Sequence, residues 1–242
     1  MKRSNFLRSA KFAASALAVF ATFAANSAQA EVLDFNNLFT GDFSIFAHGE
    51  SFAEQGFNFT VLGDANGGLA GAGVSGANDL SCTILSCPTG NSSAYYAGLN
   101  DGALSFTRQD SQGFKLRALD FAFVAPTGGL IDFSVGRLVL TGQKMDGSEI
   151  QTTVEFQPMN NDSFNFSNWQ SNGAFAQTAF RGLTINACLY TMDGSCVNPA
   201  GNQAQFAIDN LNVAVVPEPS TYAMMGLGLA GLAAFARRRK QA

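Results

Sequence analysis

Hydrophobic and polar residues alternate in short runs between Glu31 and Val216, and Gly, Asn, Asp and Pro separate the runs. Phe57, Phe59 and Val61, for example, would share one face of an extended segment, because successive side chains of a strand point to opposite sides. This period of two, together with abundant aromatic and β-branched residues, predicts β-strands. The predicted strands cover residues 32–35, 56–62, 103–107, 115–124, 136–144, 149–157, 180–187 and 205–215.

Turn residues and pattern breaks refine this prediction. Asp146-Gly147 is typical of a tight hairpin, so the two strands on either side of it should pair antiparallel. The alternation of the last strand breaks near Asn210, as it does at a β-bulge. Residues 63–102 and 158–179 are predicted to be long loops. The chain has 23 phenylalanines to fill a core, and the pattern predicts an all-β, jelly-roll-like, two-sheet β-sandwich.

The N-terminus has the features of a signal peptide. Four basic residues precede an apolar stretch over 12–25, and Ala28 and Ala30 form a small-residue cleavage site. Cleavage after Ala30 would leave Glu31 as the first residue of the mature protein. The alternative is an uncleaved anchor, which the small-residue site disfavours.

The C-terminus has three parts in a fixed order. The first is a proline motif, the second is the apolar run 221–236, and the third is a basic cluster. The proline motif is Val216, Pro217, Glu218, Pro219 and Ser220, and the basic cluster is Arg237, Arg238, Arg239 and Lys240. The apolar run predicts a membrane-spanning helix, with the basic cluster in the cytoplasm and the body outside. A buried helix of a soluble fold is the alternative. The predicted domains are therefore a signal peptide (1–30), a β-sandwich body (31–215) and a tail (216–242).

This tail resembles the PEP-CTERM sorting signal of bacterial surface proteins, which has also been catalogued as an ice-binding protein C-terminal domain. The resemblance implies an exosortase-type membrane enzyme as partner, cleavage close to Pro217-Glu218-Pro219, and an inner-membrane-anchored intermediate. The protein would then reach the cell surface or the extracellular space. The segment Gln205 to Asp209 also resembles the Gln-Phe-x-x-Asp signature of PEP-CTERM proteins whose jelly-roll bodies are similar to carbohydrate-binding modules.

Charge and composition narrow the possible functions. The body from 31 to 216 has 17 Asp and Glu against six Lys and Arg, an excess of 11 negative charges, so nucleic acid is not an expected partner. His48 is the only histidine, and no phosphate-binding loop is present. The sequence therefore predicts a protein that is not an enzyme and needs no cofactor. A hydrolase with two catalytic carboxylates is the alternative, because acidic residues are plentiful.

The four cysteines lie in the predicted exported body, where disulfides are expected. Three connectivities are possible. Pairing of sequence neighbours, Cys82 with Cys87 and Cys188 with Cys196, is favoured because short loops are the easiest to close.

Two kinds of ligand site are predicted. Trp169, Tyr95 and Tyr96 lie among small polar residues and could form a stacking surface for sugar rings, or they could be buried. Asp34 and Asp209 lie on the first and last predicted strands, which are often neighbours in jelly rolls, and could share a structural calcium ion. The alternative for Asp209 is a bulge stabilised by side-chain-to-backbone hydrogen bonds.

The predicted function is therefore a structural or carbohydrate-binding role in extracellular polysaccharide or biofilm. Ice binding would require a flat, regular array of threonines. The threonines of this chain are scattered without a repeat, so the sequence disfavours that function.

Overall fold

A computed structural model describes residues 30–38, 43–64, 67–77, 82, 85–198, 201–216, 226–232 and 236–237. The body, Ala30–Glu218, is one compact unit, and the two ends of the chain are separate from it. Residues 226–232 are helical. Within the described ranges, no helix is both long enough and apolar enough to cross a membrane. Residues 1–29 of the predicted signal peptide, and half of the predicted tail helix, lie outside those ranges.

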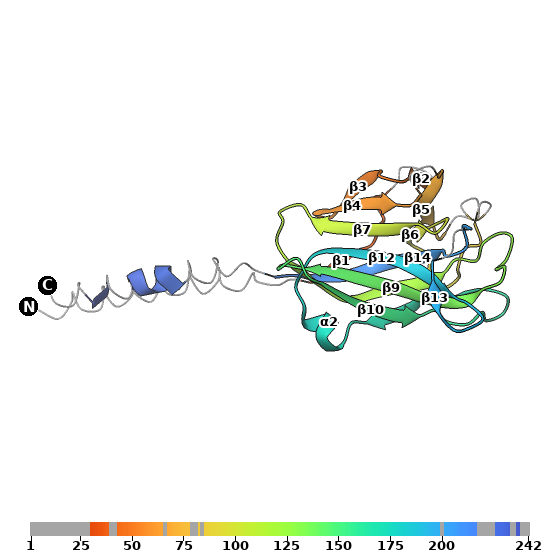
Figure 1. Cartoon of the computed structure of the whole chain (residues 1–242). Coiled ribbons are helices and arrows are strands. Elements are labelled where there is room, and N and C mark those ends of the chain that lie inside the picture. Colours follow the sequence, from red (N-terminus) through yellow and green to blue (C-terminus); the bar gives the residue numbers. More distant parts are fainter. Residues whose placement is uncertain are drawn as a thin grey trace, which may run out of the picture. The chain divides into compact units, whose positions relative to one another are not determined.

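The body is built almost entirely of strands, as Figure 1 shows. The strands are β1 (Ala30–Leu33), β2 (Phe43–Ala47), β3 (Ser51–Glu54), β4 (Phe57–Leu62), β5 (Leu69–Ser75), β6 (Ala94–Gly98), β7 (Ala103–Arg108), β8 (Phe114–Phe123), β9 (Ser134–Lys144), β10 (Glu149–Glu155), β11 (Ser167–Gln170), β12 (Phe180–Tyr190), β13 (Cys196–Val197) and β14 (Phe206–Val215). The short helix α2 (Gly173–Gln177) lies between β11 and β12. The all-β prediction is confirmed.

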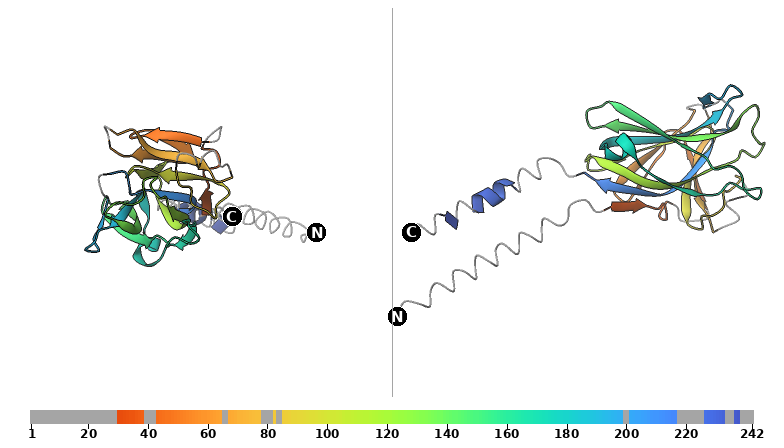
Figure 2. Two further views of the ribbon diagram at one scale, coloured as in Figure 1. Left: turned by 90° about the vertical axis from the view of Figure 1, so that its right-hand side faces the viewer. Right: turned by 90° about the horizontal axis from the view of Figure 1, so that it is seen from below.

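The described strands join into one curled sheet with the order β2-β5-β6-β14-β8-β12-β7-β4-β3. β1 adds to β14, β11 to β8, β13 to β12, and the β9–β10 hairpin to β12. β8 and β12 share only one residue pair, Phe114 with Phe180, so the sheet bends there. Figure 2 shows the curl from two further directions. The first half (β1, β2, β5, β6, β8, β11, β14) and the second half (β3, β4, β7, β9, β10, β12, β13) thus take the place of two separate sheets.

Aromatic rings from both halves fill the space between them. Phe114 of β8 meets Phe57 of β4 edge to face at 5.3 Å and stacks with Phe106 of β7, also at 5.3 Å. Phe35, which follows β1, meets Phe59 of β4 edge to face at 5.6 Å. All five rings are buried, and such pairs stabilise a core beyond the burial of apolar area alone.

All eight predicted strands are present. The hairpin between β9 and β10 is also confirmed: Gly147 has a φ of 86°, and the Lys144 amide donates to the Ser148 carbonyl at 2.7 Å. The irregularity near Asn210 is confirmed too, because the pairing of β14 with β8 shifts register between Asp209 and Asn212.

The two predicted long loops are partly wrong. Residues 63–102 contain β5 and β6, and residues 158–179 contain β11 and α2. β5 was missed because its sequence is mostly glycine and alanine, which have low strand propensity. Packing explains Gly71: a Cβ there would lie 2.2 Å from the hydroxyl of Tyr96 on the neighbouring strand.

Both predicted disulfides form, Cys82–Cys87 and Cys188–Cys196. The second joins β12 to β13 across a short hairpin, where Tyr190 pairs with Cys196. The neighbour pairing inferred from loop length is therefore correct.

Gly71→Ala tests whether ring packing decides the glycine content of β5. We expect it to lower the free energy of unfolding by about 1–3 kcal/mol, because the added methyl overpacks the core against a buried ring. Urea unfolding measures this change. Gly68→Ala is the matched control, since a Cβ there meets nothing within 4 Å.

Tyr96→Phe in the Gly71→Ala background should restore part of the lost stability. The phenol oxygen is the atom nearest to the new methyl, and it has no hydrogen-bond partner among the described residues. Equal stability of Gly71→Ala and Gly68→Ala would contradict the packing explanation.

Candidate functional site

A cavity of about 360 Å³ lies at one end of the first half of the sheet. β6 and β8 end there, and β5 and β14 begin there, because neighbouring strands are antiparallel. The connecting loops therefore meet around one hollow. Its lining consists of Leu69, Leu85, Leu99, Asn100, Ala125, Pro126, Thr127, Gly128, Gly129, Ile131, Gly201, Asn202, Gln203 and Gln205.

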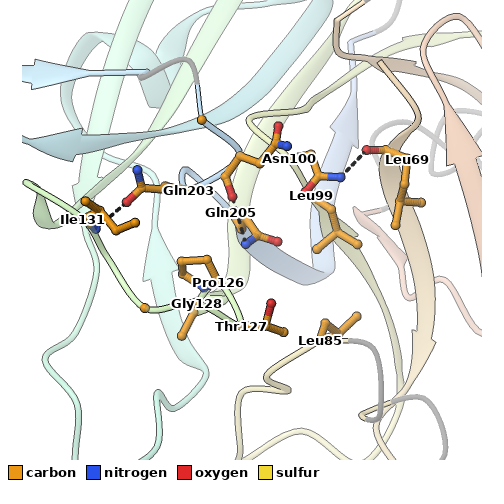
Figure 3. Close-up of a pocket in the computed structure, with 14 residues that line it drawn as sticks. Leu69, Leu85, Leu99, Asn100, Pro126, Thr127, Gly128, Ile131, Gln203 and Gln205 are labelled. Carbon is orange, nitrogen blue, oxygen red and sulfur yellow. Dashed lines mark hydrogen bonds between the residues drawn. The ribbon is translucent and has the colours of Figure 1, made fainter.

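Four of the lining residues carry amide side chains, Asn100, Asn202, Gln203 and Gln205. Figure 3 shows Asn100, Gln203 and Gln205 across the cavity from Pro126 and Thr127. The Oε1 atom of Gln203 accepts from the Ile131 amide at 2.7 Å, and the Nδ2 atom of Asn100 donates to the Leu69 carbonyl at 2.8 Å. Asn100 and Gln203 are thus each held through one of the two polar atoms of the side-chain amide. Asn100 Oδ1 and Gln203 Nε2 have no hydrogen-bond partner in the described part of the chain.

One carboxylate fixes the loop that carries these amides. The two oxygens of Asp101 accept from the backbone N–H groups of Gly201, Asn202, Gln203 and Ala204 at 3.1, 2.6, 2.8 and 2.7 Å. Hydrogen bonds to a charged acceptor are stronger than neutral ones. Asp101 therefore fixes the backbone at Gln203, and both of its carboxylate oxygens are occupied by backbone N–H donors.

A second, apolar hollow of about 500 Å³ lies next to the first. The two share Ala125, Pro126 and Gly129, so the loop that follows β8 forms the wall between them. Leu130 and Met159 also line the second hollow. This loop contributes the Thr127 hydroxyl to the first cavity and Leu130 to the second, apolar hollow.

The chemistry of the first cavity is that of neutral hydrogen bonding. Amides both donate and accept, the Thr127 hydroxyl does the same, and aliphatic side chains surround them. A small neutral molecule with several hydroxyls matches such a lining.

The predicted aromatic stacking surface is wrong for the two tyrosines. Tyr95 and Tyr96 are both fully buried, and as neighbours in β6 they point to opposite faces of the sheet. Tyr95 packs on Phe166 at 5.2 Å, whereas Tyr96 packs on Phe35 at 6.3 Å. Burial raises the pKa of both phenols. They are core residues, and no sugar ring can stack on them.

Trp169 is half-buried rather than fully exposed. It pairs with Leu119 across β11 and β8, and its ring meets Phe175 of α2 edge to face at 6.1 Å. It is not among the residues that line the cavity. A role for its exposed part in sugar binding stays a prediction.

The first and last strands are neighbours, as predicted, but the proposed calcium ligands face different partners. β1 pairs with β14 in the register Leu33 to Leu211. Asp34 accepts from Asn36 and Gln55 at the surface, whereas Asp209 is fully buried. Within the described ranges no three His, Cys, Asp or Glu side chains are grouped to hold a metal ion. Calcium shared by these two carboxylates stays a prediction.

Asp209 instead holds a covering segment onto the sheet. Its Oδ2 atom accepts from Asn91 Nδ2 and Ser93 Oγ, both at 2.7 Å. Its Oδ1 atom accepts from the backbone N–H of Asn210, also at 2.7 Å. Asp120, its partner across the strands, accepts from Asn168 and Asn210, each at 2.8 Å. Burial, first, and the nearby charge of Asp120 raise the pKa of Asp209 to about 6.

Sequence reasoning missed the cavity residues Asn100 and Gln203 and the anchoring role of Asp101, and it named Gln205 only as the first residue of the Gln-Phe-x-x-Asp signature. The only local signal is the Asn100-Asp101-Gly102 turn, which predicts a bend and not a site. Residues about 100 positions apart in the chain meet only through strand pairing.

A comparison with protein families bears on the tail. The PEP-CTERM protein-sorting motif matches residues 215–240. The chain carries a PEP-CTERM sorting motif. This motif is a signal for processing by exosortase, a membrane enzyme, and it implies export through a membrane-anchored intermediate. In the PEP-CTERM motif of this chain, Pro217, Glu218, Pro219 and Ser220 lie outside the described residues.

Solved structures resemble the chain weakly. The carbohydrate-binding module TmCBM61, in complex with beta-1,4-galactotriose, is 11% identical, with a TM-score of 0.31 over 64% of this chain and 86% of that chain. An exo-beta-agarase is 9% identical, with a TM-score of 0.35 over 78% and 26%. A structure of carbohydrate-binding modules from the β-sandwich superfamily is also 9% identical, with a TM-score of 0.31 over 78% and 63%. No curated protein sequence matches the chain significantly.

Asp209→Asn tests the buried carboxylate through the pH dependence of stability. Between its ordinary pKa of 3.8 and its folded value of about 6, the folded protein binds a proton that the unfolded chain releases. The contribution of Asp209 to stability is therefore largest below pH 3.8 and decreases as the pH rises through about 6. The wild type should gain stability relative to Asp209→Asn when the pH is lowered from about 7 to about 4.

Urea unfolding at both pH values measures this gain. Asp162→Asn, which changes an exposed carboxyl, is the matched control. A stability difference between wild type and Asp209→Asn that does not change with pH would show that burial does not raise the pKa of this carboxyl.

Proposed function

We infer that this protein is exported, sorted through its PEP-CTERM motif, and binds a neutral carbohydrate through the cavity at the end of its sheet. An N-terminal signal peptide (1–30) would direct export. The apolar run 221–236 would hold the protein in the inner membrane as a helix until an exosortase-type enzyme cuts near Pro217-Glu218-Pro219. The mature body would then act without catalysis in the extracellular polysaccharide or biofilm.

The observation that carries the binding proposal is the pair of half-satisfied amides in the cavity. Asn100 and Gln203 are fixed through Leu69 and Ile131, so an acceptor and a donor are already oriented when a ligand arrives. Little side-chain entropy is then lost on binding. The volume of about 360 Å³ lies in the range of small-molecule sites and suits one or two sugar units.

A polysaccharide hydrolase remains the second candidate. It would need two carboxyl groups flanking a bound glycosidic bond. Asp120 and Asp209 are opposite each other in the sheet, but Asp209 is buried and accepts from Asn91 and Ser93, and Asp120 accepts from the side-chain amides of Asn168 and Asn210. The amide lining of the cavity supports binding over hydrolysis.

Gln203→Glu should weaken binding of a short neutral oligosaccharide. Glutamate keeps the acceptor for the Ile131 amide but replaces the free Nε2 donor with an oxygen. Loss of one neutral hydrogen bond reduces affinity by roughly threefold to tenfold, and an unpaired carboxylate adds to the loss. The measurement is glycan-array binding followed by calorimetry, with the full-length protein in mild detergent.

Gln177→Glu, on the exposed side of α2, is the control for the added charge. Thr127→Val should weaken binding of the same glycan without a change of charge. If none of the arrayed neutral glycans binds the wild type, or if Gln203→Glu binds as well as the wild type, the cavity is not the binding site.

Alanine at Pro217, Glu218 and Pro219 should block processing. The cells would then accumulate a longer, membrane-associated form that retains the basic cluster ending at Lys240. Mass spectrometry of the intact protein from membrane and medium fractions measures this, and it also tests for Glu31 as the mature N-terminus. Pro158→Ala in the body is the control. Release of the triple variant at the wild-type length would argue against recognition at this motif.

A further inference from the structure

The second half of the sheet aligns uncharged polar side chains in one row on its outer face. The row crosses six neighbouring strands, and every step follows the pairing register. Its members, from β3 to β10, are Ser51, Thr60, Ser105, Thr184, Thr141 and Gln151. We call this set the hydroxyl row. These residues are far apart in the sequence, so only strand pairing brings them together.

Hydrogen bonds within the hydroxyl row join its members in pairs. The hydroxyl oxygens of Ser51 and Thr60 lie 3.1 Å apart. The Thr184 hydroxyl donates to the Ser105 hydroxyl at 3.2 Å, and Gln151 Nε2 donates to the Thr141 hydroxyl at 3.1 Å. A hydroxyl has one donor and two acceptor positions, so each pair keeps hydrogen-bonding positions that its internal bond does not use. The pairing also fixes the rotamers before a ligand arrives, which lowers the entropic cost of binding.

The rows on either side of the hydroxyl row are also almost free of charge. One contains Asn58, Thr107, Gly182 and Gln143, and the other contains Leu62, Ala103, Asn186, Val139 and Thr153. Of the described residues in the three rows, only Glu149 at the edge is charged. The body as a whole has 17 acidic and six basic residues, so this neutral face differs from its average surface.

We propose that the hydroxyl row is a second carbohydrate site, which binds an extended, uncharged polysaccharide chain laid across the strands. The argument is one of chemical complementarity: a neutral face of hydroxyls and amides matches a neutral chain of hydroxyls, whereas a polyanion would be repelled by the acidic body. The site is separate from the end cavity and does not depend on it.

The shape of the sheet favours a flexible chain over a crystalline surface. Strands are about 4.8 Å apart, so the six-strand row spans about 24 Å, enough for several sugar units. Each strand is rotated against the next by about 20–25°, which adds up to roughly 100° over the row. A polymer can follow this twist, but a planar ice face cannot.

The test is retention of the full-length protein, in mild detergent, on columns of cross-linked dextran, agarose and cellulose. We expect retention on at least one neutral matrix, little change when salt is raised, and weaker retention on the carboxymethyl form of the same matrix. Thr141→Val/Thr184→Val should reduce the retention constant about tenfold, because two neutral hydrogen-bonding groups are lost. Thr152→Val, on the opposite face of β10, should leave retention unchanged.

A second variant, Ser51→Ala/Thr60→Val, tests the other end of the row if the first pair disturbs folding. Elution of the wild type in the void volume of all three columns would overturn the proposal, as would wild-type retention of folded variants at both ends. Retention lost in Gln203→Glu but kept in the row variants would assign the polymer to the end cavity instead. Inhibition of ice recrystallisation that depends on the row would reassign the face to ordered water.

Discussion

The packing of aromatic rings between two halves of a bent sheet is the constraint on which the rest of the structure depends. The sheet turns at a single residue pair, Phe114 with Phe180, and both rings are fully buried. Rings need room, and glycine supplies it: a Cβ at Gly98 or Gly142 would lie 2.3 Å from the ring of Phe206 or Phe180. Glycine therefore stands at these strand positions because an aromatic ring occupies the space that a side chain would need.

Because the core is apolar and aromatic, the carboxylates of the half-buried Asp101 and the buried Asp209 hydrogen-bond to loop segments. Asp101 collects four backbone N–H groups of the loop before β14, and Asp209 collects donors from the segment that covers the first half of the sheet. The carboxylate of Asp209 is fully buried, and these donors replace the water that it loses. Asp101 and Asp209 thus have structural roles. The two proposed binding surfaces, the end cavity and the hydroxyl row, offer uncharged groups to a ligand.

The two ends and the body carry different kinds of information. The PEP-CTERM motif, residues 215–240, concerns how the protein is processed, and most of its residues follow Glu218, the last residue of the compact body. The end cavity and the hydroxyl row lie in the body, and both offer hydroxyl and amide groups without charge. A protein that is moved to the outside of the cell would meet polysaccharide there, so the proposed binding surfaces suit the expected location.

The sequence alone determined the strands with clear alternation, the Asp146-Gly147 hairpin, the bulge at Asn210 and the neighbour pairing of cysteines. Each of these is local, because side-chain period, turn chemistry and loop length act over a few residues. The sorting motif is also a linear signal and is readable from the tail. By contrast, β5 and the burial of Tyr95 and Tyr96 depend on what lies across the sheet, which no local pattern records.

Only the tertiary structure decided where the candidate sites are. Asn100 and Gln203 become neighbours because β6 and β14 are antiparallel and adjacent, so the end of one meets the start of the other. In the same way, threonines that appear scattered in the sequence, such as Thr60, Thr141 and Thr184, fall into one row through strand register. Register is a long-range property: a shift of one residue would turn every one of these side chains into the core.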